Sequence, residues 1–179
     1  MSVQLFGAAA LWVAALSPAG QAADHADVAA QVQAVSDLAD RGDFAALEQI
    51  FAPNIAVNYS TLSGAPAATV PAKVLLSDWA SLLPGFDRTH HVQRALTVVL
   101  DDDRAEVRSS VEADHWLDGA VWSVRGTYEF RLMRQAGEWR ITAMTFILQD
   151  ETGSRGLLTE AALRAADNPP AYLVEQEPG

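Results

Sequence analysis

The chain has 179 residues, half of them apolar, so it is long enough to bury one substantial core without a second domain. Its formal net charge of −11 argues against nucleic acid or anionic membrane surfaces as partners, because phosphate groups repel an acidic protein. The sequence contains no cysteine, which excludes disulfides, thiolate metal sites and a cysteine nucleophile.

An apolar run from Leu5 to Leu16 opens the chain, and small residues follow it. The run is too short to cross a bilayer, which needs roughly 20 residues, and its pattern is typical of a secretory signal peptide. We therefore expect residues 1–22 to be a signal peptide, cut after Ala22 or Ala23. The protein would then be exported, periplasmic or secreted, without a stable membrane anchor. A buried N-terminal helix is the alternative, since no Lys or Arg precedes the apolar run.

Apolar residues recur at helical spacing in three segments of the mature chain, and glycine or proline ends each segment. The predicted helices are Asp27–Asp40, Phe44–Phe51 and Pro71–Leu83. Asp43 has the side chain of an N-cap for the second helix. Between the second and third helices we expect a short strand, Ile55–Tyr59, and a loop, Ser60–Thr69, that is rich in Ser, Gly, Pro and Ala.

Four β-rich stretches follow, and the short turn sequences that join them suit an antiparallel meander. They cover residues 90–100, 104–117, 121–134 and 138–149. A short helix is predicted over Leu157–Ala166, and residues 167–179 are predicted to form a flexible tail. Helices followed by a strongly curved, mostly antiparallel sheet indicate the α+β class, with the helices covering one face of the sheet in a single domain, residues 24–166.

The second β-rich stretch alternates in polarity, with apolar or small residues at the odd positions from Ala105 to Ala113. His115 shares that parity, so it is predicted to point into the interior beside Val107 and Val111. A titratable ring in that position needs a partner or stays neutral. It is either a functional histidine or a core histidine whose neighbours satisfy it.

His90 and His91 begin the first β-rich stretch, and adjacent residues of a regular strand point to opposite faces. Alternation counted back from Val98 and Leu100 places His90 inside. A β-bulge or a late start of the strand would place His91 inside instead.

Asp40 ends the first predicted helix, and Tyr59 ends the first predicted strand. A carboxylate is disfavoured by the dipole at a helix C-terminus, so Asp40 is either solvated or kept at that position by a functional role. A carboxylate, imidazoles and a phenol together are what general acid/base catalysis near neutral pH requires.

Seven segments carry a recognisable pattern: Ser36–Phe44, Phe51–Pro53, Val57–Tyr59, Thr89–His91, His115, Gly126–Tyr128 and Gly137–Ile141. The pattern resembles SnoaL-like proteins of the nuclear transport factor 2-like superfamily, and scytalone dehydratases in particular. It extends over nearly the whole mature chain. The resemblance implies a cone-shaped fold built around one pocket.

The resemblance also implies roles for individual residues. The dehydratase pocket holds an aspartate hydrogen-bonded to a histidine, a second histidine, and tyrosines that hold a water against the substrate carbonyl. By position these correspond to Asp40 paired with His115, to His91 and to Tyr59.

Two positions depart from the dehydratase pattern. Ala39 stands where that family has a second water-holding tyrosine, and Tyr128 stands in place of a substrate-binding asparagine. The resemblance therefore supports the type of site but not scytalone as the substrate.

The expected ligand is a small hydrophobic or aromatic compound with a carbonyl group, bound in part by Tyr128 and Trp79. The resemblance implies neither a cofactor nor a metal. His91, His115 and Asp40 could also form a metal triad of two histidines and one carboxylate, but no short ligand spacing supports that hypothesis. A homodimer or homotrimer is a further expectation from the family.

The sequence thus predicts a cofactor-independent dehydratase or isomerase in which Asp40 orients His115 as general base and then acid. Tyr59 would polarise the carbonyl oxygen, and His91 would assist the leaving hydroxyl group. The alternative is a non-catalytic module of the same fold that binds a small ligand.

Overall fold

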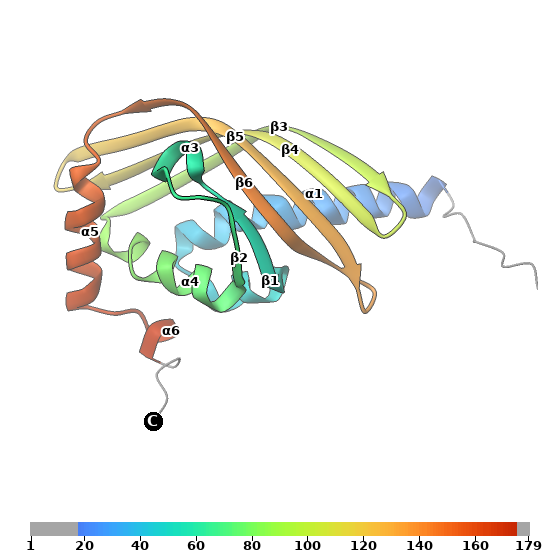
Figure 1. The fold of residues 1–179 in the computed structure, drawn as a ribbon, viewed down its shortest axis with the longest axis horizontal. Coiled ribbons are helices and arrows are strands. Elements are labelled where there is room, and N and C mark those ends of the chain that lie inside the picture. Colours follow the sequence, from blue (N-terminus) through green and yellow to red (C-terminus); the bar gives the residue numbers. More distant parts are fainter. Residues whose placement is uncertain (1–17, 175–179) are drawn as a thin grey trace, which may run out of the picture.

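A strongly curved sheet of six strands is the largest element of the fold, which the computed structural model describes for residues 18–174 (Figure 1). The strand order is β2-β1-β6-β5-β4-β3, and neighbours are antiparallel except for β1 and β6, which are parallel. The strands are β1 Phe51–Asn58, β2 Ala68–Pro71, β3 Arg88–Asp101, β4 Arg104–Leu117, β5 Ala120–Gln135 and β6 Glu138–Thr152.

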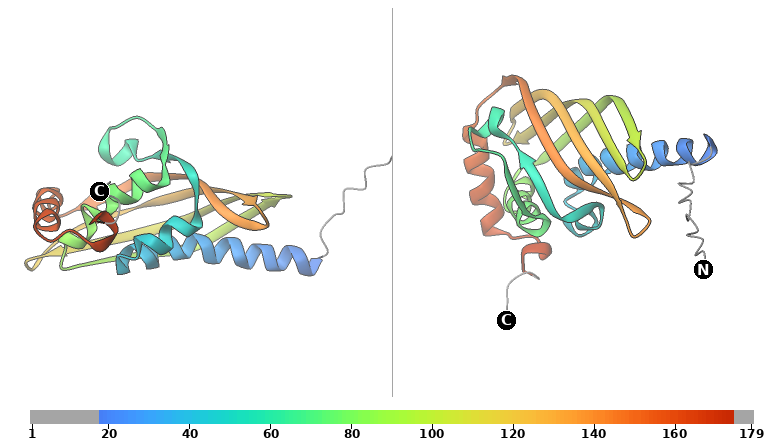
Figure 2. Two further views of the ribbon diagram at one scale, coloured as in Figure 1. Left: turned by 90° about the horizontal axis from the view of Figure 1, so that it is seen from below. Right: turned by 45° about the vertical axis from the view of Figure 1, so that its right-hand side comes forward.

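Helices cover one face and one end of the sheet. Figure 2 shows α1 lying along one face, with α4 and α5 gathered at one end. The helices are α1 Pro18–Arg41, α2 Phe44–Ile50, α3 Ser60–Ser63, α4 Ala72–Ala80, the 3₁₀ helix η1 Leu83–Gly85, α5 Gly156–Asp167 and α6 Ala171–Val174. This arrangement confirms the predicted α+β class and the cone-shaped architecture.

The buried face of α1 follows from its spacing of apolar residues. Val28, Val32, Val35 and Ala39 recur every three or four positions, and all four are buried. They pack against the inner side chains of β3 and β4, among them Val107 and Val111. The C-terminal end of this face therefore lies against the sheet where His91 and His115 emerge.

Helix α1 begins earlier than its apolar periodicity predicts, at Pro18 instead of Asp27. The reason is Asp24, which is buried at 7% exposure although it is charged. Its carboxylate lies 2.5 Å from the Arg134 guanidinium and accepts a hydrogen bond of 3.3 Å from the Trp139 indole. A polar anchor of this kind leaves no trace in a hydrophobic pattern.

A β-bulge in β3 decides which histidine faces inward. Ala95 has a φ of 53°, and the pairing with β4 shifts by one residue between Arg94 and Thr97. Odd-numbered residues point inward before the bulge and even-numbered residues after it: Thr89, His91 and Gln93, then Leu96, Val98 and Leu100. Alternation counted back through the bulge therefore gives the wrong parity, and His91 is the inward residue.

Two segments predicted to be irregular contain regular structure. The expected loop Ser60–Thr69 includes α3 and the start of β2, which pairs with β1 as an edge strand. The expected flexible tail includes α6, where Tyr172 is buried against Phe44 and its hydroxyl donates to Glu48 at 3.2 Å. One aromatic ring thus fixes residues 171–174 to the domain.

The four β-rich stretches of the meander are confirmed as β3 to β6, with ends that differ by up to three residues. Most of the expected signal peptide, residues 1–17, lies outside the described residues, as does the end of the predicted tail, residues 175–179. Between residues 18 and 174, the structure contains no helix with the length and apolar character of a membrane span.

Candidate functional site

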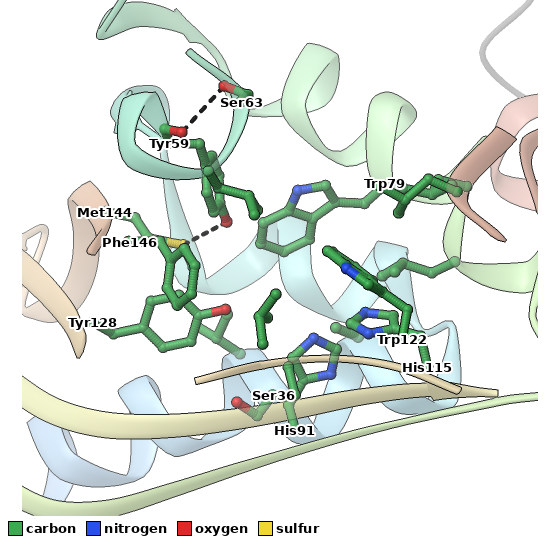
Figure 3. A pocket seen from close by; sticks show the side chains of 18 of the residues that line it. Ser36, Tyr59, Ser63, Trp79, His91, His115, Trp122, Tyr128, Met144 and Phe146 are labelled. Carbon is green, nitrogen blue, oxygen red and sulfur yellow. Dashed lines mark hydrogen bonds between the residues drawn. The ribbon is translucent and has the colours of Figure 1, made fainter. Parts of the chain in front are cut away.

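A cavity of about 270 Å³ lies between the inner face of the sheet and helices α1, α3, α4 and α5 (Figure 3). Most of its lining is aliphatic or aromatic. Five of the six predicted site residues line it: Tyr59, Trp79, His91, His115 and Tyr128. The sixth, Asp40, reaches the cavity through its contact with His91.

Asp40 and His91 form a hydrogen-bonded pair at the wall of the cavity. Oδ1 of Asp40 lies 2.6 Å from Nδ1 of His91, and Oδ2 accepts the backbone N–H of His91 at 2.7 Å. Thr89 adds a third hydrogen bond, from its hydroxyl to Oδ1 at 2.8 Å. Because a carboxylate only accepts, Nδ1 carries the proton, and Nε2 of His91 keeps a free lone pair.

These donors explain how a carboxylate is tolerated at the C-terminal end of α1. Burial by itself raises the pKa of Asp40, but the hydrogen bonds and positive charge of His91, together with Thr89, outweigh it. The net effect lowers the pKa below its ordinary value. Asp40 is therefore ionised at neutral pH and can stabilise a protonated His91.

His115 lies in a different environment, although it is close to His91. Its ring packs 4.8 Å from Trp122, 5.0 Å from Phe86 and 5.2 Å from the His91 ring, measured between centroids. Its Nδ1 is buried without a hydrogen-bond partner among the described residues. Burial, and then the neighbouring His91, lower the pKa of His115 to about 4. His115 is therefore neutral at physiological pH.

The expected pairing of Asp40 with His115 is wrong, since both carboxylate oxygens of Asp40 bind the segment Thr89–His91. The bulge in β3 brings His91 to the end of α1, whereas His115 lies one strand further along the sheet. The preference for His91 over His90 as the pocket residue is confirmed. The His90 side chain is 60% exposed, and its only recorded contact with Asp40 is at 3.7 Å.

The phenols of Tyr59 and Tyr128 and the indole of Trp79 face the His91 and His115 rings (Figure 3). The Tyr59 hydroxyl contacts the sulfur of Met144 at 3.7 Å, a weak acceptor. Tyr128 is 8% exposed and, among the described residues, its hydroxyl has no hydrogen-bond partner. Burial raises the pKa of Tyr128 and of Tyr59, so both phenols remain protonated donors.

Sequence reasoning missed two supporting residues on β3, Thr89 and Gln93. Thr89 shares its parity with His91, so knowledge of the bulge would have identified it. Gln93 also points inward, where it donates to the carbonyl of Val32 and to Ser36, both on α1. Its amide oxygen accepts from Ser109 at 2.8 Å. This network fixes α1 against β3 and β4 directly beside the Asp40–His91 pair.

Arg155 was also missed, and it joins two walls of the cavity. It donates to the Leu62 carbonyl on α3 at 2.8 Å and forms two hydrogen bonds with Glu151. Glu151 in turn accepts the indole N–H of Trp122 at 2.7 Å. Glu151 and Arg155 lie four positions apart, but no signal in the sequence connects them to Leu62 or Trp122, which they contact only in the folded chain.

Within residues 18–174, no cluster of three or more histidine, aspartate or glutamate side chains has a geometry that could hold a metal ion.

A family model described as a SnoaL-like domain matches residues 20–145, which is most of the chain. The chain belongs to the SnoaL-like family. No curated protein sequence matches it.

Several solved structures share the SnoaL-like fold. A Kribbella flavida protein, Kfla4162, is 26% identical with a TM-score of 0.72, and the match covers 78% of this chain and 99% of that one. A putative scytalone dehydratase from Novosphingobium aromaticivorans is 18% identical with a TM-score of 0.64, over 75% and 90% of the two chains. A hexachlorocyclohexane dehydrochlorinase, LinA-type3 from Novosphingobium barchaimii, is 15% identical with a TM-score of 0.64, over 78% and 96%.

Proposed function

We propose that this protein is a cofactor-independent lyase or isomerase that removes a proton from carbon next to a carbonyl group in a small, largely apolar substrate. The observation that carries the proposal is the pair of Asp40 and His91 at the wall of an apolar cavity. A base held by an ionised carboxylate in such an environment suits proton abstraction from carbon.

The proposed reaction begins when Nε2 of His91 takes the α-proton, while Asp40 stabilises the imidazolium that forms. Tyr59 donates a hydrogen bond to the carbonyl oxygen as negative charge develops on it. In a dehydration, the carbon–oxygen bond then breaks and His91 returns its proton to the leaving hydroxyl group, so that water is the second product. In an isomerisation, His91 returns the proton to another carbon.

The neutral ring of His115 would orient the polar edge of the substrate beside His91. Its pKa of about 4 makes it a poor base at neutral pH but leaves it able to form a hydrogen bond. This assignment exchanges the roles that the sequence suggested for the two histidines.

Structural neighbours give the proposal limited support. The names of two of them denote loss of water and loss of hydrogen chloride, both of which remove a proton and a leaving group from a carbon skeleton. At 18% and 15% identity they share the fold with this chain, and the chemistry is our proposal.

The test is to incubate the protein in D₂O with a panel of β-hydroxy ketones and α,β-unsaturated ketones and to follow α-deuterium incorporation and product by NMR. We expect exchange or turnover with at least one ring-containing ketone, and we expect Asp40→Asn to abolish most of it. Absence of exchange across a panel whose members do bind would contradict the proposal.

A ligand-binding module without catalysis is the second candidate. The observation in its favour is Ala39, which stands where the dehydratase resemblance places a water-holding tyrosine and which leaves that wall of the cavity apolar. A binder would be stabilised by several members of the panel without turnover, and Asp40→Asn would bind them like the parent.

We also propose that the protein is exported. Asp24 is the first buried residue of the described chain, so cleavage after Ala22 or Ala23 would remove only residues that lie before this anchor. Mass spectrometry of the protein from its native host should find a chain that starts at Ala23 or Asp24. An intact start at Met1 or Ser2 in the cytoplasm would contradict export.

A further inference from the structure

The cavity holds two phenol groups with unused capacity to donate hydrogen bonds. Within residues 18–174, the sulfur of Met144 is the only hydrogen-bond partner of the Tyr59 hydroxyl, and the Tyr128 hydroxyl has none. A thioether is a weak acceptor, and a buried tyrosine hydroxyl ordinarily finds a strong one. A ligand that fills this cavity without an oxygen would leave both donors unsatisfied, which costs free energy.

The two phenols lie on the same side of the cavity. Both rings pack against Phe146, at centroid distances of 6.2 Å for Tyr59 and 5.4 Å for Tyr128. Burial, and then the neighbouring Tyr128, raise the pKa of Tyr59 well above its usual value. Figure 3 shows the two tyrosines on one side of the cavity and the His91 and His115 rings on the other.

Resting on the proposed function, we infer that Tyr59 and Tyr128 together bind a single oxygen atom of the ligand, the one that becomes an enolate oxygen. Tyr128 is then a second catalytic donor, supplied from β5. It compensates for Ala39, where the dehydratase resemblance places a tyrosine on the first helix. Two donors on one oxygen stabilise developing negative charge more than one donor does.

The arrangement also defines the class of ligand. The oxygen-binding end and the base lie on opposite sides of a cavity of about 270 Å³, roughly nine water-sized volumes. Aromatic and aliphatic side chains make up most of the remaining lining. The ligand is therefore a one- or two-ring compound with an oxygen at one end that can carry negative charge, such as a cyclic ketone that forms an enolate. Phenolates are stable mimics of that enolate.

The test compares two small probes of nearly equal shape, 4-nitrophenol and 4-nitrotoluene. Binding is measured by equilibrium dialysis, and the ionised form of bound 4-nitrophenol is followed by its visible absorbance. We expect the parent protein to bind 4-nitrophenol at least about tenfold more tightly than 4-nitrotoluene and to favour its ionised form. Failure of the parent to bind 4-nitrophenol, or equal affinity for both probes, would overturn the inference.

Substitutions then assign the preference to the phenols. Tyr128→Phe and Tyr59→Phe should each weaken 4-nitrophenol binding by roughly 10- to 100-fold and change 4-nitrotoluene binding by less than about threefold. The matched control is Tyr172→Phe, which removes a hydroxyl that contacts Glu48 outside the cavity and should change neither affinity. Equal losses for both probes in Tyr128→Phe would mean that this ring only shapes the cavity, and the inference would be wrong.

The binding test is independent of turnover, so the two proposals can fail separately. Phenolate selectivity that depends on Tyr59 and Tyr128, in a protein that exchanges no α-proton, would support the oxygen site and refute the enzyme. Turnover that depends on Asp40 but survives Tyr128→Phe, with phenolate affinity unchanged, would support the enzyme and refute the oxygen site.

Discussion

The two imidazole rings of the cavity, His91 and His115, have different neighbours. Around His91 the wall of the cavity is polar, with Asp40 as an ionic partner and Thr89 as a further donor to that carboxylate. Around His115 it is aromatic, and Nδ1 of His115 has no partner in the described structure. Both histidines are largely buried, with 11% of the His91 side chain and 5% of the whole His115 residue exposed.

A carboxylate partner therefore separates the two histidines: Asp40 holds the proton of His91 on Nδ1, whereas desolvation lowers the pKa of His115, which has no carboxylate partner at Nδ1 within residues 18–174.

The largest expected effect is on turnover. His91→Asn removes the proposed base while keeping some polarity, and it should reduce the rate by roughly 10²- to 10⁴-fold. Asp40→Asn should cause a loss of similar order because it removes the charge that stabilises the imidazolium. The measurement is kcat/KM for whichever ketone of the panel shows exchange.

His115→Asn is the matched comparison for that experiment. It should cost about 2- to 13-fold in kcat/KM, the equivalent of one hydrogen bond of about 0.5 to 1.5 kcal/mol. If His115→Asn lost more rate than His91→Asn, the roles assigned to the two histidines would have to be exchanged.

The second expected effect is on acid stability. The pKa of His115 in the folded protein is about 4, below its ordinary value of 6.5. Between these pH values His115 is therefore protonated in the unfolded chain and neutral in the folded chain. This group therefore lowers the free energy of unfolding as pH falls from 7 to 4, by roughly 3 kcal/mol at most. His115→Phe should flatten that decline in urea unfolding measured at pH 7 and pH 5. An unchanged slope would mean that His115 takes up its proton while folded.

The third effect concerns the Asp40 side of the comparison. Thr89→Val keeps the shape of the side chain but removes one donor to the Asp40 carboxylate, and it should destabilise the fold by roughly 1 to 2 kcal/mol at pH 7. Thr97→Val, at an exposed position on the same strand, is the control and should stay within about 0.5 kcal/mol of the parent. Equal effects of the two substitutions in urea unfolding would contradict a special role for Thr89.

The smallest effect is expected at the aromatic wall. Trp122→Phe keeps a ring beside His115 but loses the indole donor to Glu151, which retains its two bonds to Arg155. We expect a loss of about 0.5 to 1.5 kcal/mol in the free energy of unfolding. A loss above about 3 kcal/mol would show that Glu151 depends on this indole far more than the geometry indicates.

Much of the fold was predictable because it depends on periodic patterns. The alternation from Ala105 to His115 identifies the inner face of β4. In the turns Asp118-Gly119 and Ala136-Gly137, all four residues have the positive φ angles that such turn sequences suggest. The early start of α1 was not predictable, because it depends on Asp24 meeting Arg134 across more than a hundred residues.

The residues of the candidate site were predictable from the sequence, but the contact of Asp40 with His91 instead of His115 was not. Asp40, Tyr59, His91 and His115 gather around one cavity as the resemblance implies. Which histidine binds Asp40 depends on the one-residue bulge at Ala95, and a single bulged residue leaves no reliable mark in the sequence.

We infer that Asp40 holds a proton on Nδ1 of His91, which leaves Nε2 as the basic nitrogen of the neutral ring, and that His115 stays neutral at physiological pH. Long-range ¹H–¹⁵N correlation spectra of the histidine side chains between pH 4 and 8 test it directly, with His91→Asn and His115→Asn used to assign the signals. We expect the neutral form of His91 to be the Nδ1–H tautomer and His115 to take up a proton only near pH 4. An Nε2–H tautomer at His91, or a His115 that titrates near pH 6.5, would contradict this inference.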